Sequence, residues 1–122
     1  MEIIRHPGFL EIILPEFFEL DPRTDNFSRI FSAEQPGTHG LLINLTGHVR
    51  IPRFRDIEED LHFCRALEDA FKSITDEIEI IIFLVNSKTR ETIIPYAKIL
   101  RSAGFNVKVS TNRRKMVAIL SY

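Results

Sequence analysis

Three arginines stand close together in the middle of the chain, just before a segment with strong helical periodicity. Arg50, Arg53 and Arg55 fall within six consecutive residues. Guanidinium groups bind carboxylates and phosphates through paired hydrogen bonds, and the free N–H groups at the start of a helix also favour an anion. The cluster therefore predicts a site for an anion or a phosphorylated partner. The alternative is a solvated loop whose arginines pair with the acidic residues at 58–60.

A second group of polar residues follows the apolar runs that we expect to form parallel strands. In open α/β sheets, ligands usually bind at the edge where parallel strands end. The residues expected there are Thr46, Gly47, His48, Asn86, Ser87, Lys88, Ser110 and Thr111. Loops at this edge are polar in every protein of the class, so the pattern locates a candidate binding site without identifying what binds.

Other kinds of chemistry find no support in the sequence. His62 and Cys64 lie two residues apart on an expected helix and so face different ways, while His39 and His48 are in expected loops. Neither pair has the spacing of metal ligands. Cys64 belongs to an apolar stripe and is interpreted as a small buried side chain rather than a nucleophile. With no nucleophile elbow and no glycine-rich phosphate loop, we expect no metal, no cofactor and no enzymatic activity.

Length, composition and charge favour one cytoplasmic domain covering residues 1–122. The chain is 44% hydrophobic and carries a net charge of -1, which provides no global field for nucleic acid or an anionic membrane. The basic triplet Arg113-Arg114-Lys115 lacks interleaved aromatic residues, so it is interpreted as the polar start of a helix. The single cysteine favours a reducing compartment. The N-terminus does not resemble a signal peptide, and no apolar run reaches the roughly 18 residues of a membrane span.

The stretch 77–109 predicts the βαβ unit around which the other elements are arranged. Ile78 and the block 80–85 are almost uniformly apolar, as is typical of a strand buried on both faces. The alternating segment 105–109 predicts the next strand, parallel to the first. The intervening residues predict a helix closed by Gly104 in the left-handed conformation.

The start of that helix has two candidates, and they differ in what they imply for Pro95. With Thr92 as the N-cap, Pro95 lies in the first turn, where its missing N–H costs no hydrogen bond. With Thr89 as the N-cap, one internal bond is lost and a kink is expected.

The remaining elements follow from periodicity and turn chemistry. Segments 2–5 and 9–14 predict a hairpin around His6-Pro7-Gly8. We expect a short helix at 24–33 and a strand at 41–45. Helical periodicity over 54–74 predicts a long helix that starts at the Asp56 capping box, with Phe54 just outside it. The segment 116–120 predicts either a strand paired with 105–109 or a helix capped by Ser110 or Thr111.

Three stretches, together with the order of the elements, resemble the STAS domain, the fold of bacterial anti-sigma factor antagonists. Residues 83–92, Phe-Leu-Val-Asn-Ser-Lys-Thr-Arg-Glu-Thr, are similar to that family's strand, polar turn and helix. Residues 42–47, Leu-Ile-Asn-Leu-Thr-Gly, are similar to its aliphatic strand ending in Asp-Leu-Ser-Gly. The stretch 109–120 resembles its capped final helix, which favours the helical alternative at the C-terminus.

The resemblance implies an α/β fold with a mixed sheet of five strands, an antiparallel first hairpin and about four helices packed mainly on one face. One departure concerns regulation. The family's phosphorylated residue lies in an Asp-Ser-Ser/Thr-Gly turn, whereas residues 50–55 here read Arg-Ile-Pro-Arg-Phe-Arg. That segment has no hydroxyl group and no glycine, so we do not expect the usual phosphorylation switch.

The resemblance implies a non-enzymatic regulatory module that binds a protein, such as an anti-sigma factor or a kinase-like partner. The alternative is a small-ligand, nucleotide or anion sensor that uses the strand-end loops and the arginine cluster. A receiver-like enzyme is disfavoured because Asn44 and Asn86, rather than aspartates, stand near strand ends. Phe17 and Phe18 leave two interpretations open, a homodimer contact or a part of this domain's own core.

Overall fold

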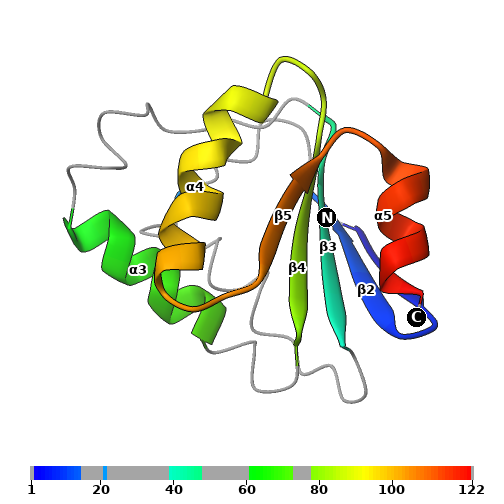
Figure 1. Ribbon diagram of the computed structural model, residues 1–122, viewed down its shortest axis with the longest axis horizontal. Coiled ribbons are helices and arrows are strands. Elements are labelled where there is room, and N and C mark those ends of the chain that lie inside the picture. Colours follow the sequence, from blue (N-terminus) through cyan, green and yellow to red (C-terminus); the bar gives the residue numbers. More distant parts are fainter. Residues whose placement is uncertain (1, 15–20, 22–38, 48–60, 73–77, 122) are drawn as a thin grey trace.

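The computed structural model describes residues 2–14, 21, 39–47, 61–72 and 78–121, which contain five strands and three helices (Figure 1). The elements are β1 (Glu2–His6), β2 (Phe9–Ile13), β3 (Gly40–Leu45), α3 (Leu61–Lys72), β4 (Ile80–Val85), α4 (Arg90–Ser102), β5 (Val107–Ser110) and α5 (Arg113–Leu120). The predicted α/β class is confirmed, with three helices in this part of the chain rather than about four. The predicted helix at 24–33 lies outside the described residues, as do Phe17, Phe18 and Asp56.

The five strands form one mixed sheet in the order β1-β2-β3-β4-β5. β1 and β2 are antiparallel, and each later neighbour is parallel to the strand before it. The predicted hairpin is confirmed, with Gly8 at a φ of 85° after Pro7, a backbone region that glycine adopts without strain. Residues Ile81–Val85 of β4 are almost completely buried, as its unbroken apolar run predicted.

Helices cover both faces of the sheet. Figure 1 shows α3 and α4 on one side and α5 on the other. Two separate apolar cores match this arrangement. The larger packs α3 and α4 against the sheet and includes Leu67, Phe71, Tyr96, Leu100, Ile43 and Phe83. The smaller packs Met116 and Leu120 of α5 against Phe9, Leu42, Ile82 and Leu84. Most of the described helical surface is therefore on one face, but α5 covers the other.

The structure distinguishes between the two predicted N-caps of α4. The N-cap is Thr89 and not Thr92, so Pro95 lies inside the helix. Pro95 has no N–H to donate to the carbonyl of Glu91, and one internal hydrogen bond is missing. The helix starts early because the Asn86 side chain, at the end of β4, accepts hydrogen bonds from the N–H groups of Lys88 and Thr89, both at 2.9 Å.

The end of α4 is the predicted glycine cap. Gly104 has a φ of 99°, and the N–H of Phe105 donates to the carbonyl of Leu100 at 3.0 Å while that of Gly104 donates to Arg101 at 3.0 Å. These two bonds make a Schellman motif. The tight turn leads the chain directly into β5.

The C-terminal segment is a helix, so the alternative of a strand paired with β5 is wrong. The cap also differs from the prediction, because Asn112 and neither Ser110 nor Thr111 occupies the N-cap position. The Asn112 side chain accepts a hydrogen bond from the N–H of Lys115 at 3.1 Å. Asparagine is among the best N-caps, since its short amide reaches the free N–H groups of the first turn.

Among the described helices, none is long and apolar enough to cross a membrane.

Candidate functional site

Four of the predicted binding residues lie at one edge of the sheet, where β3 and β4 end. Thr46 follows β3, and Asn86, Ser87 and Lys88 follow β4. Because β3 and β4 are hydrogen-bonded neighbours, their ends meet, and the Asn86 side-chain amide donates to the Thr46 carbonyl at 3.4 Å. Gly47 follows Thr46, and Ser110 and Thr111 stand at the end of β5. His48, Arg50, Arg53 and Arg55 lie outside the described residues.

Asn86 shapes the loop that carries Ser87 and Lys88. Its side-chain oxygen accepts from the N–H groups of Lys88 and Thr89 and from the Thr89 hydroxyl, the last at 3.1 Å. An amide used in this way folds the backbone into a tight turn. Ser87 and Lys88 are consequently presented on the surface, where both are exposed.

Asn44 connects this edge to the interior of the sheet. Its side-chain oxygen accepts from the N–H of Thr46 at 3.0 Å and from the Thr46 hydroxyl at 2.6 Å. Its amide nitrogen donates to Glu11 at 3.2 Å. A chain of polar contacts therefore runs from Asn86 through Thr46 and Asn44 to a carboxylate in β2.

That carboxylate, Glu11, is only 1% exposed and is held by three side chains. Arg113 donates to both of its oxygens at 2.6 Å, and Asn44 contributes the bond just described. The Nε2 atom of His6 lies 3.0 Å from Oε1, and the imidazole is stacked on Phe9. The bidentate geometry is that of a strong charge-assisted pair.

The electrostatics of the cluster favour the charged forms of Glu11 and Arg113. The hydrogen bonds from Arg113 lower the pKa of Glu11 to about 2, against the opposing effect of burial and with further help from His6 and Asn44. The same bonds raise the pKa of Arg113. Since every member is engaged within the cluster and Glu11 is sealed from solvent, the arrangement fixes the start of α5 against the sheet.

Sequence reasoning missed this cluster, because Glu11 was read simply as part of an apolar strand. A signal was present: Glu11 stands alone among apolar neighbours in Phe9–Ile13, and a carboxylate buried in a sheet requires a partner. The identity of the partner was not readable, since Arg113 lies 102 residues away.

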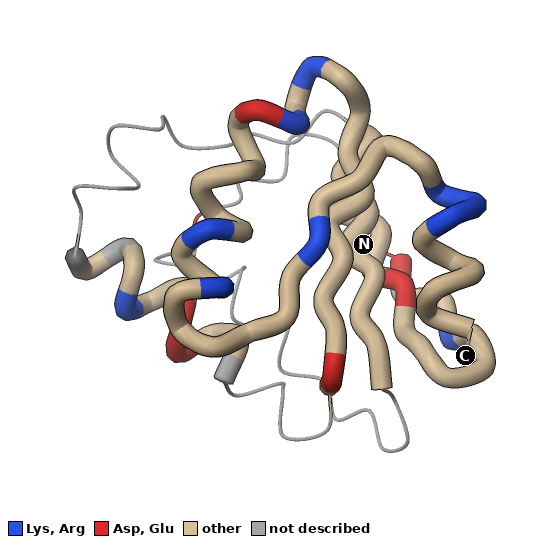
Figure 2. The backbone as a smooth tube through the Cα atoms, in the orientation of Figure 1, with Lys and Arg blue, Asp and Glu red and all other residues tan. Residues whose placement is uncertain are grey.

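Exposed basic residues and a shallow hollow lie at the same edge of the sheet. Lys88 and Arg90 stand at the start of α4, and Arg114 and Lys115 at the start of α5; all four are exposed. Figure 2 shows the basic segments of the two helices at the ends where β4 and β5 finish. A hollow of about 370 Å³ lies beside the start of α4 and is lined by Ser87, Arg90, Glu91, Ile94 and Thr111.

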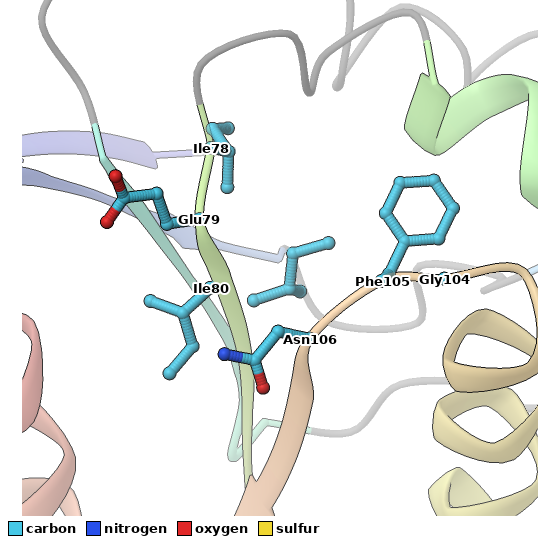
Figure 3. A pocket seen from close by; sticks show the side chains of 7 residues that line it. Ile78, Glu79, Ile80, Gly104, Phe105 and Asn106 are labelled. Carbon is cyan, nitrogen blue, oxygen red and sulfur yellow. The ribbon is translucent and has the colours of Figure 1, made fainter.

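A second cavity lies at the opposite edge, where β4 and β5 begin. Its volume is about 280 Å³, and its polar lining side chains are Glu79 and Asn106. In Figure 3 the Asn106 side chain points toward β4, and the Phe105 ring points away toward α3, where its centroid lies 6.3 Å from that of Phe71. The cavity adjoins residue 78, where the described chain resumes, and brings no reactive group together.

The described residues hold no group of three or more His, Cys, Asp or Glu side chains that could bind a metal. Cys64 lies half-buried on α3 and forms no disulfide bond.

The fold thus defines an α/β protein with a mixed, mainly parallel sheet and a polar, basic edge at the strand ends. Comparisons with family models, with curated proteins and with solved structures find no significant match.

Proposed function

We propose that this protein is a non-enzymatic regulatory module of bacterial signalling that binds another protein through the edge where β3, β4 and β5 end. The observation that carries the proposal is the exposed Ile94 side chain in the hollow at this edge. Ile94 is 42% exposed, and polar or charged side chains surround it. An apolar centre with a polar rim is the usual composition of a protein-binding surface.

The way the loop is held also supports this proposal. The hydrogen bonds of Asn86 and Thr46 order the backbone before any partner arrives, so binding costs little conformational entropy. The resemblance of residues 42–47 and 83–92 to an anti-sigma factor antagonist points to an anti-sigma factor or a kinase-like protein as the partner. Since segment 50–55 carries no hydroxyl group, the interaction would not depend on the usual phosphorylated residue.

Site-specific crosslinking tests this function directly. A photo-crosslinking amino acid is introduced at Ser87 in the full chain and expressed in the native host; the control position is Asn106, exposed at the opposite edge. We expect one protein to be crosslinked at Ser87 in near-stoichiometric amount and not at Asn106. Absence of any crosslinked protein at Ser87, or equal crosslinking at both positions, would contradict the proposal.

A second candidate, a sensor of small anions or nucleotides, is favoured by the size and charge of the same hollow. Its volume of about 370 Å³ falls within the range of small-ligand sites, and Arg90 contributes a guanidinium group to the wall. A thermal-shift screen with nucleotides and phosphorylated metabolites tests this alternative. A melting temperature that stays constant across millimolar ligand concentrations would exclude it.

A further inference from the structure

The start of α4 and the start of α5 place four cationic side chains at one edge of a nearly neutral protein. They are Lys88, Arg90, Arg114 and Lys115, all exposed. No ion pair in the part of the chain that the structure describes uses any of them. The whole chain carries a net charge of -1, so these four side chains are a local concentration of positive charge, within the described residues, that the overall charge does not suggest.

Arg113, unlike these four residues, is paired with a carboxylate. That pairing holds the part of α5 that carries Arg114 and Lys115. Its guanidinium is occupied by Glu11, through two hydrogen bonds of 2.6 Å. This pair secures the first turn of α5 to β2, and Met116 packs into the smaller core one turn later. Arg114 and Lys115 therefore project from a fixed helix end rather than from a loose tail.

The hollow beside the start of α4 supplies an apolar contact next to one of these basic residues, Arg90. Arg90 and Glu91 of α4 and Thr111 of the β5–α5 connection all line it, and the exposed Ile94 forms part of its wall. A ligand seated in the hollow would therefore meet the apolar Ile94 beside the guanidinium of Arg90. A ligand long enough to extend along the edge would also reach the other basic residues there.

From this arrangement we infer that the partner presents an acidic peptide segment with a central apolar side chain, bound across the edge between α4 and α5. The inference rests on the proposed protein-binding function and specifies the chemistry of its partner. Opposite charges on the two surfaces steer association and fix the orientation of the segment. The apolar side chain contacts Ile94 and is removed from water.

A protein segment fits this edge better than a nucleic acid does. Single strands are bound through aromatic side chains that stack on the bases, and none of the described residues that line the hollow is aromatic. The carboxylate of Glu91 stands in the wall of the hollow, where it can accept hydrogen bonds from the N–H groups of a peptide backbone.

Fluorescence anisotropy with the full chain tests the inference. The probe is a labelled peptide of Asp and Glu residues with one Leu at its centre; the comparisons are a basic peptide of equal length and a single-stranded oligonucleotide of equal negative charge. We expect the acidic peptide to bind best, with an affinity that falls as salt rises from about 0.05 M to about 0.5 M. Equal binding of the basic peptide, tighter binding of the oligonucleotide, or no binding of the acidic peptide would overturn the inference.

Charge-matched variants locate the binding surface. The double variant Lys88→Glu with Arg90→Glu should weaken acidic-peptide binding about tenfold. Arg65→Glu with Lys108→Glu makes the same change in net charge at exposed positions of α3 and β5. This pair should leave acidic-peptide binding unchanged. Equal loss in both pairs would show a non-specific charge effect and overturn the inference.

The apolar contact has its own test. Ile94→Ser should weaken binding of the Leu-containing peptide about fivefold. It should leave binding of a peptide with Ser in place of Leu unchanged. Identical effects on both peptides would contradict a contact at Ile94.

The crosslink at Ser87 distinguishes failure of the proposed function from failure of this inference about the partner's chemistry. If the crosslink forms while the peptide experiments fail, the acidic chemistry is wrong and the protein-binding function stands. If it does not form, the function itself is wrong.

Discussion

The guanidinium of Arg113 donates to both oxygens of the Glu11 carboxylate at 2.6 Å, which joins residues 102 positions apart in the chain. Glu11 is buried in β2, whereas Arg113 at the first turn of α5 is 48% exposed. The pair is therefore asymmetric, because water can solvate the arginine when its partner is lost but cannot reach the carboxylate. This asymmetry leads to two predictions about stability.

Removing the arginine should lower the free energy of unfolding more than neutralising the carboxylate does. Arg113→Met leaves the buried Glu11 carboxylate without its arginine, held only by His6 and Asn44 among the described residues, and we expect the free energy of unfolding to fall by about 3 kcal/mol. Glu11→Gln leaves a half-exposed guanidinium that water can solvate, with an expected loss of about 1–2 kcal/mol. Urea unfolding followed by circular dichroism measures both. Arg114→Met, at the exposed neighbouring position, is the control and should change stability by less than about 0.5 kcal/mol.

The same pair should make the protein sensitive to acid. The pKa of Glu11 is lowered from 4.5 to about 2 in the folded protein, so the unfolded chain binds this proton more readily. The stabilisation is complete above about pH 4.5 and is lost as the pH falls toward 2, by at most about 3 kcal/mol. The stability difference between the natural protein and Glu11→Gln should shrink over this interval. A constant difference from pH 5 to pH 2 would show that Glu11 is not held as a carboxylate.

Gly104→Ala should destabilise the protein for a conformational reason alone. Its φ is 99°, and an added methyl group would have no neighbour within 4 Å, so no clash contributes. We expect a loss of about 1–2 kcal/mol from strain in the left-handed region. Gly47→Ala is a matched control, since that position is equally open and does not have a positive φ. Equal losses at the two positions in chemical denaturation would contradict the explanation.

Asn86→Ala should weaken the start of α4. The substitution removes the acceptor for the N–H groups of Lys88 and Thr89, and we expect a loss of about 1–2 kcal/mol together with faster amide hydrogen exchange in residues 88–93. Asn106→Ala is the control, because the Asn106 side chain makes no hydrogen bond within the described part of the chain. Unchanged exchange in Asn86→Ala would show that Thr89 starts the helix without help.

The elements that sequence reasoning predicted correctly depend on local patterns. The apolar run of β4 identifies a strand buried on both faces, the Pro7-Gly8 turn identifies the first hairpin, and Gly104 identifies the end of α4. In each case the informative residues are adjacent or one helical turn apart. The start of α4 was harder, because the deciding acceptor is the side chain of Asn86, outside the helix, and it outweighs the cost of placing Pro95 inside.

The candidate site shows the same division between local and distant information. The sequence by itself placed Thr46, Asn86, Ser87 and Lys88 at the ends of neighbouring strands, because parallel strands end at a common edge. Only the tertiary structure decided that α5 packs on the opposite face from α3 and α4, and that Arg113 is committed to Glu11. The physical reason is that a buried carboxylate demands a partner without specifying where in the chain it lies. Packing of the whole sheet determined which arginine could reach it.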